Sequence, residues 1–94
     1  MDVVHGTGGI SPEEAIRLLK DRLKESPEYG KGHWALALAY RELGQRANSS
    51  KHYKLAYRFE PDNAKLFHQY LDTVERREEY EEVLGEYVQR HPNN

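Results

Sequence analysis

The sequence predicts an all-α fold in which five helices pack as antiparallel helix-turn-helix units stacked in a short array. Three observations lead to this prediction. Apolar residues recur at helical spacing along most of the chain. Pro27 and Pro61 lie 34 residues apart, and the residues around them superimpose. Charged residues make up 32% of the chain, so we expect thin interfaces between helices rather than one thick core.

The first helix is expected over residues 12–25. Ser11 can cap its N-terminus, Pro12 suits the first helical position, and Glu14 is placed to complete a capping box. Its apolar face combines Ala15, Leu18, Leu19 and Leu23. On the opposite face, an ion pair is expected between Glu13 and Arg17. Pro27 ends the helix, because the residue before a proline is driven out of the helical conformation.

The other helices are expected near residues 31–43, 47–59, 64–77 and 80–90. The second helix is apolar on nearly all sides, which suits a helix covered by neighbours on both flanks. His91 and Pro92 arrive three residues earlier than the 34-residue offset predicts, so the last helix is expected to be short. Because each tyrosine hydroxyl needs a hydrogen-bond partner, most of the seven tyrosines are expected to reach the surface.

Composition narrows the class of protein. Residues 1–10, which contain three glycines, are interpreted as a flexible tail, and residues 11–94 as one domain. The absence of cysteine excludes disulfides and thiolate zinc sites, and a net charge of −2 favours neither nucleic acid nor an anionic membrane as a partner. With no apolar run of about 18 residues and no signal-peptide pattern, we expect a soluble, cytoplasmic domain.

Eight residues in the middle of the chain follow the packing pattern of a known repeat family. They supply a large apolar residue, a small residue, an aromatic and a turn glycine, then a small residue, an aromatic, an alanine and a closing proline: Leu36, Ala37, Tyr40, Gly44, Ser49, Tyr53, Ala56 and Pro61. The chain therefore resembles the tetratricopeptide repeat family, whose helix-turn-helix unit recurs every 34 residues. The resemblance implies a short right-handed α-solenoid, with a half repeat at 11–29, a full repeat at 30–63 and a last repeat at 64–92.

The resemblance also implies a function as a protein-interaction scaffold, because the first helices of successive repeats in that family line a concave groove that binds peptide segments. Carried over position by position, the groove residues are Lys31, Trp34, Leu38, Arg41, Lys65, His68, Gln69, Asp72 and Arg76. Trp34 and Leu38 between cations would suit a peptide with an apolar anchor and a carboxylate. A different interpretation is that Trp34 and Leu38 only cover the first helix. Members that clamp the C-terminal carboxylate of heat-shock chaperones use asparagines where this chain has Leu38 and Asp72, which argues against such a clamp.

A second hypothesis is a structural or oligomerisation module. A repeat array normally ends in polar capping helices, and this chain would leave apolar faces bare at both ends. The residues expected on those faces are Ile16, Leu19, Leu23, Leu84, Tyr87 and Val88. The partner in this hypothesis is a second copy of the chain or the rest of a longer protein.

Neither catalysis nor a cofactor is predicted. The five histidines lack the spacing of a metal-ligand set, and no carboxylate lies in an apolar run that would tune it for acid–base work. The basic stripe of Lys51, Lys54 and Arg58 is interpreted as a solvent-facing surface rather than a phosphate site. It has no interleaved aromatics on which the bases of single-stranded RNA could stack.

Overall fold

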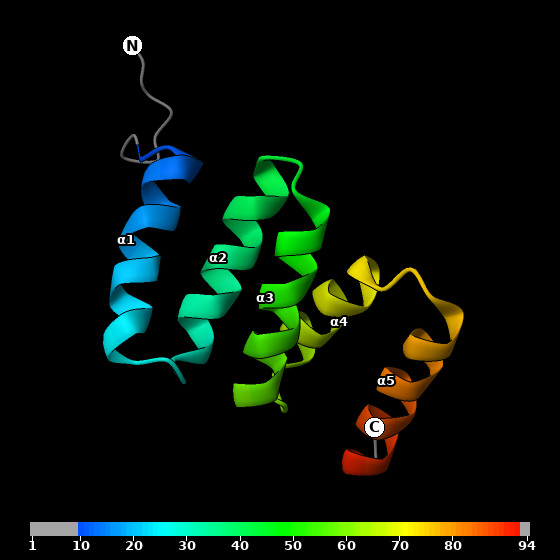
Figure 1. Ribbon diagram of the computed structural model, residues 1–94. Helices are drawn as coiled ribbons and strands as arrows, with labels where there is room; N and C mark the ends of the chain where they lie inside the picture. Colours follow the sequence, from blue (N-terminus) through cyan, green and yellow to red (C-terminus); the bar gives the residue numbers. More distant parts are fainter. Residues whose placement is uncertain (1–9, 93–94) are drawn as a thin grey trace.

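The computed structural model describes residues 10–92, and these form five helices and no strand (Figure 1). The helices are α1 (Pro12–Glu25), α2 (Gly30–Glu42), α3 (Arg46–Phe59), α4 (Ala64–Thr73) and α5 (Arg77–Arg90). The predicted all-α class and the number of helices are confirmed for this part of the chain. The predicted tail lies outside the described residues except for Ile10, and His5 lies outside them too.

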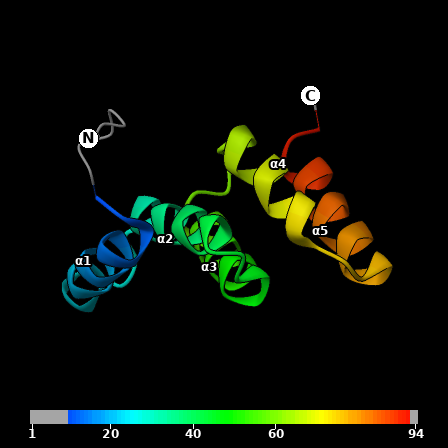
Figure 2. The same cartoon turned by 90° about the horizontal axis from the view of Figure 1, so that it is seen from above.

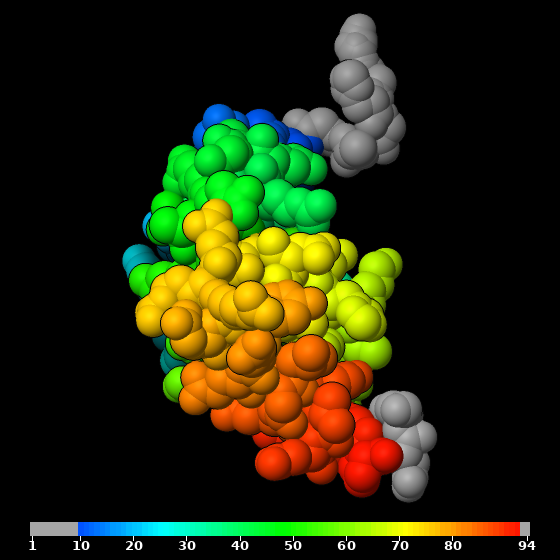
Figure 3. Space-filling model, turned by 90° about the vertical axis from the view of Figure 1, so that its right-hand side faces the viewer, coloured from blue at the N-terminus to red at the C-terminus, as the bar shows by residue number. Residues whose placement is uncertain are grey.

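Each helix makes its main contacts with its neighbours along the chain, from α1 against α2 to α4 against α5. Figures 1 and 2 show α1, α2 and α3 side by side, with α5 at the opposite end of the molecule from α1. Seen from the α5 end, α5 and α4 form the near surface and only a small part of α1 is visible beyond them (Figure 3). The molecule is elongated, measuring 47 Å by 27 Å by 23 Å. None of the described helices combines the length and the apolar character that crossing a bilayer requires.

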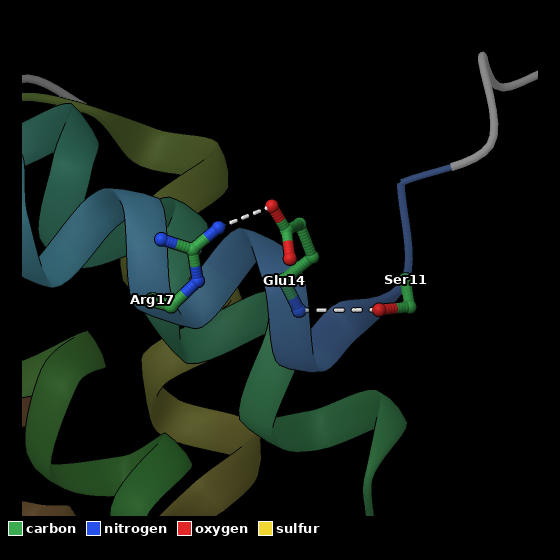
Figure 4. A network of polar contacts seen from close by, with 3 residues as sticks. All are labelled: Ser11, Glu14 and Arg17. Carbon is green, nitrogen blue, oxygen red and sulfur yellow. Dashed lines mark hydrogen bonds and ion pairs between the residues drawn. The ribbon is translucent and has the colours of Figure 1, made fainter.

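The start of α1 follows the predicted cap in part. The Ser11 hydroxyl accepts a hydrogen bond of 3.1 Å from the backbone N–H of Glu14 (Figure 4). Pro12 occupies the first turn. The side chain of Glu14 does not complete the capping box, because it pairs with Arg17 instead. The predicted partner of Arg17, Glu13, is therefore wrong by one position. Residues three apart on a helix are neighbours just as residues four apart are, and Arg17 pairs with the residue three positions before it.

The apolar face of α1 is narrower than predicted. No residue of α1 is fully buried, and the side chain of Leu18 is 45% exposed. Among the helices of residues 10–92, α2 is the one that makes substantial contact with α1. The stripe of Ile16, Leu19 and Leu23 is therefore half-buried, while Leu18 is exposed. The expectation that Leu18 belongs to the packed face is wrong.

The pair of α2 and α3 forms the best-packed part of the molecule. As predicted, α2 is flanked on both sides, by α1 and α3, and most of its residues are buried. Gly44 has a φ of 75°, the left-handed conformation that lets the chain turn sharply from α2 into α3. Across this interface the hydroxyl of Ser49 donates a 2.9 Å hydrogen bond to the backbone carbonyl of Ala37. Both residues are buried, so the small side chains allow close approach of the two helices.

The boundary between α4 and α5 differs from the prediction of 64–77 and 80–90. The last repeat is three residues shorter than the 34-residue offset predicts. The shortening falls in α4, which has 10 residues, and not in α5, which has 14. Val74 is extended, with φ −82° and ψ 119°, and the Thr73 hydroxyl donates a 2.7 Å hydrogen bond to the backbone carbonyl of Tyr70. By starting at Arg77, α5 brings Glu78 and Glu79 into its first turn, where the helix dipole favours anions.

Most tyrosines lie in the core rather than at the surface. Tyr53 and Tyr70 are among the largest fully buried side chains, and Tyr40 and Tyr57 are buried as well. The ring of Tyr57 packs against Tyr70 and Phe67, and these rings and Tyr53 belong to a cluster that joins α2 through α5. Tyr40 stacks on His52 instead. Burial of several rings in one cluster outweighs the cost of enclosing their hydroxyls, and the prediction that most tyrosines reach the surface is therefore wrong.

Candidate functional site

The groove between α2 and α4 is bridged by a hydrogen bond. The indole Nε1 of Trp34 donates to the side-chain Oε1 of Gln69 over 2.6 Å. The ring of Trp34 is half-buried and packs against the core cluster, whose members come mostly from α3, α4 and α5. Trp34 therefore does not serve only to cover α1, which was the second interpretation of this residue.

A pocket of about 220 Å³ lies in this groove. Three of the predicted groove residues line it, namely Arg41 from α2 and Gln69 and Asp72 from α4. The rest of its wall comes from Arg46, Ser49 and Thr73. Arg46 and Ser49 were missed because the resemblance assigns the groove to the first helices of the repeats, whereas these two residues stand at the start of α3. Thr73 is the last residue of α4 and was not among the positions carried over.

The charges of the pocket are arranged around Arg41. Its guanidinium donates a 3.4 Å hydrogen bond to the hydroxyl of Tyr53. This hydrogen bond raises the pKa of Arg41 above its ordinary value, and the nearby carboxylate of Asp72 acts in the same direction. Arg46 forms a 2.7 Å ion pair with Glu75 at the surface. The pocket thus presents a guanidinium, a carboxylate and an amide to whatever enters it.

The other predicted groove residues lie outside this pocket. Leu38 is 38% exposed on α2, and Lys31, Lys65 and His68 are exposed. Arg76 is not on the face of α4, because α4 has already ended, and it lines a different hollow between α3 and α5. Its assignment to the α2–α4 groove is therefore wrong.

The hollow between α3 and α5 has a volume of about 610 Å³ and was not predicted. Its wall on α3 carries Lys54 and Arg58, and its wall on α5 carries glutamates. Tyr57 and Tyr70 form its inner side. The interpretation of the basic stripe as a merely solvent-facing surface is incomplete, because Lys54 and Arg58 face an acidic helix across this hollow.

The predicted self-association residues fall into two groups. Ile16, Leu19 and Leu23 are half-buried in the chain itself, and Tyr87 stacks on Phe67 with ring centroids 3.8 Å apart. Leu84 and Val88 are exposed on α5, as is Tyr80, which the sequence interpretation did not include. These last three residues, spaced by four, form a stripe along one side of α5.

A column of four aromatic rings runs between α2 and α3. Tyr40 stacks on His52, His52 on His33, and His33 on Phe59, with centroid separations of 5.4–5.9 Å. Burial lowers the pKa of His52 to about 4, and His33, Lys51 and Lys20 add to this effect. Within residues 10–92, no three His, Asp or Glu side chains are grouped so that they could hold a metal ion.

Comparisons with protein-family models, with curated proteins and with solved structures find no match to this chain. Its function is therefore inferred from the residues and the geometry described above.

Proposed function

We propose that this chain is a tetratricopeptide-like helical repeat that acts as a protein-interaction scaffold and binds a peptide segment of its partner in the groove between α2 and α4. The observation that carries the proposal is that Arg41, Gln69 and Asp72, from two different helices, line one pocket. The hydrogen bond between Trp34 and Gln69 ties the same two helices together beside it.

The helix bounds support the repeat. α1 and α3 begin at Pro12 and Arg46, and α2 and α4 begin at Gly30 and Ala64, so each pair is offset by 34 residues. Contacts mainly between neighbours in the chain are what a stacked array of helix pairs requires. The left-handed Gly44 at the turn between α2 and α3 fits the same unit.

The shape and the charge of the pocket favour one side chain of a peptide over a small molecule. Its volume of about 220 Å³ is below the roughly 300–1,000 Å³ of typical small-molecule sites. A guanidinium such as that of Arg41 binds carboxylates through parallel hydrogen bonds. An exposed leucine on the same helix, Leu38, offers an apolar contact next to it. We therefore expect a peptide in which an acidic residue accompanies an apolar one.

The test is selection from a displayed library of random peptides, followed by fluorescence polarisation with the enriched peptides. Arg41→Ala is expected to weaken binding about tenfold to hundredfold, because a charge-assisted hydrogen bond contributes about 1.5–3 kcal/mol. Arg58→Ala is the matched control, since it removes the same group from the hollow between α3 and α5 and should leave peptide binding unchanged. Enriched peptides that bind the Arg41→Ala variant as tightly as the wild-type chain would contradict the proposed site.

A further inference from the structure

The outer face of α1 carries an exposed leucine between charges of opposite sign. Leu18 shares this face with Glu14, Asp21 and Glu25, because positions 14, 18, 21 and 25 follow one another at spacings of four, three and four residues. Arg22 lies on the other flank of Leu18, four residues further along the helix. All of these side chains are exposed. Glu14 and Asp21 form surface ion pairs with Arg17 and Lys24, and Arg22 lies over the ring of Tyr29; such exposed contacts are weak and can be exchanged for contacts with a partner. No residue of α1 is fully buried, so this helix still has apolar surface that a partner could cover.

The hollow between α3 and α5 has the complementary arrangement. Lys54 and Arg58 stand on its α3 wall, and Glu82 and Glu86 stand on its α5 wall. Arg76 and Arg90 line the hollow at the two ends of α5. Among residues 10–92, no ion pair joins α3 to α5, so the charges of both walls are open to an incoming group.

The inner side of the hollow is formed by aromatic rings. Tyr57 is 9% exposed and Tyr70 is 2% exposed. The side chain of Arg90 lies close enough to the hydroxyl of Tyr57 to act on its pKa, so Arg90 lies at this inner side too. Val83 lines the same side.

We propose that α1 of a second copy of this chain docks in the hollow between α3 and α5, so that copies join head to tail. Leu18 of the incoming helix lies against the tyrosine floor. Its acidic flank faces Lys54 and Arg58, and Arg22 faces the glutamates of α5. Lys54, Arg58 and the central glutamates of α5 thus meet charges of the opposite sign, an arrangement that favours this orientation over the reversed one.

The positions of the two surfaces favour a head-to-tail contact over a symmetric one. α1 and α5 lie at opposite ends of the elongated molecule (Figure 2), so one copy can use both surfaces at once. Unlike surfaces that join in this way give a heterologous contact, which can propagate from copy to copy. A symmetric dimer would instead use one patch twice, and the exposed stripe of Tyr80, Leu84 and Val88 on α5 is the surface available for it.

The experiment is sedimentation equilibrium of the full 94-residue chain over a range of concentrations and at low and high salt. The average mass of the wild-type chain is expected to rise with concentration and to fall with added salt, because exposed charges are screened. Leu18→Glu, which removes the leucine, and the double variant Lys54→Glu with Arg58→Glu, which reverses the basic wall, are each expected to stay monomeric. Circular dichroism of both variants reports whether the helices are retained.

Mixing the two defective variants is the decisive measurement. The Leu18→Glu chain keeps an intact hollow and the double variant keeps an intact α1, so the mixture is expected to form a one-to-one complex and nothing larger. Leu84→Glu is the matched control, because Leu84 is also an exposed leucine, at 37%, and lies outside the hollow. It should associate as the wild-type chain does.

Three outcomes would overturn the proposal: a wild-type chain that is monomeric at every concentration, folded variants whose mixture remains monomeric, or association that Leu84→Glu abolishes. The last result would assign the contact to the stripe on α5. Peptide binding by the Leu18→Glu chain is measured in parallel. It depends on the α2–α4 groove, so failure of this contact and failure of the proposed function are distinguishable.

Discussion

The histidine pair between α2 and α3 should make the stability of this protein depend on pH. Nε2 of His33 lies 2.8 Å from the backbone carbonyl of Pro27, which can only accept, so this nitrogen carries a proton and donates. Nδ1 of the neutral His33 ring is then an acceptor, and the proton in the 3.2 Å contact between the two Nδ1 atoms belongs to His52.

The magnitude follows from the pKa of His52. Burial, helped by His33 and two lysines, lowers this pKa from its ordinary value of 6.5 to about 4 in the folded chain. Between pH 6.5 and pH 4, His52 therefore binds a proton in the unfolded chain but stays neutral in the folded chain. The contribution of His52 to stability is complete above pH 6.5 and declines as the pH falls from 6.5 toward 4. Between pH 7 and pH 5 the shift amounts to about 2 kcal/mol, which we reduce to about 1 kcal/mol because the ring is only half-buried.

The assay is urea unfolding at pH 7 and pH 5. His52→Phe retains a ring between Tyr40 and His33 but cannot titrate, so it should remove about 1 kcal/mol of the loss in unfolding free energy that the wild-type chain undergoes on acidification. His68→Phe is the control, because it removes a histidine that is exposed on α4 and should leave the loss at its wild-type size. Equal losses in the wild-type chain and in His52→Phe would refute the reasoning.

Four further substitutions test the packing and the helices. Gly30→Ala should lower the free energy of unfolding by about 1–3 kcal/mol, because its Cβ would lie 2.7 Å from Glu60 and 3.1 Å from Phe59. In Gly85→Ala the new Cβ meets nothing within 4 Å, so this change should raise the free energy of unfolding by about 0.5–1 kcal/mol. Thermal melts of the two glycine variants check both signs, and equal melting temperatures would contradict these two predictions. Phe67→Ala should cost about 3–5 kcal/mol in urea unfolding, since Phe67 is buried and stacks on Tyr87, and a loss below 1 kcal/mol would count against that contact. Ser49→Ala should cost about 1 kcal/mol by removing the hydrogen bond to Ala37, and an unchanged urea midpoint would disprove this.

The sequence predicts the first three helices well because their boundaries are marked by local chemistry. Ser11 and Pro12 start α1, Pro27 follows its end, and Gly44 turns α2 into α3. The boundary between α4 and α5 has no such mark. Neither proline nor glycine occurs at residues 74–76, and the position of the break depends on the extended Val74 and on the start of α5.

The sequence predicted those site residues whose position follows from the face of a single helix. The resemblance led to Arg41, Gln69 and Asp72, which the structure brings to one pocket. It could not give Arg46, because a contact at the start of α3 depends on how α3 and α4 pack. The hollow between α3 and α5 was missed for the same reason, since its two charged walls meet only in the tertiary structure. Whether each tyrosine is buried or exposed likewise depends on packing between helices and not on the periodicity of the sequence.

In the described part of the chain α1 packs mainly against α2, so the free energy that holds α1 in place is separate from that of the central helices. Detachment of α1 exposes one face of α2 and leaves the contacts of α3 with α2 and α4 in place. A chain built in this way loses its order from the ends inward rather than in a single step. Amide hydrogens of α1 will accordingly exchange with solvent through openings that leave those of α2 and α3 protected.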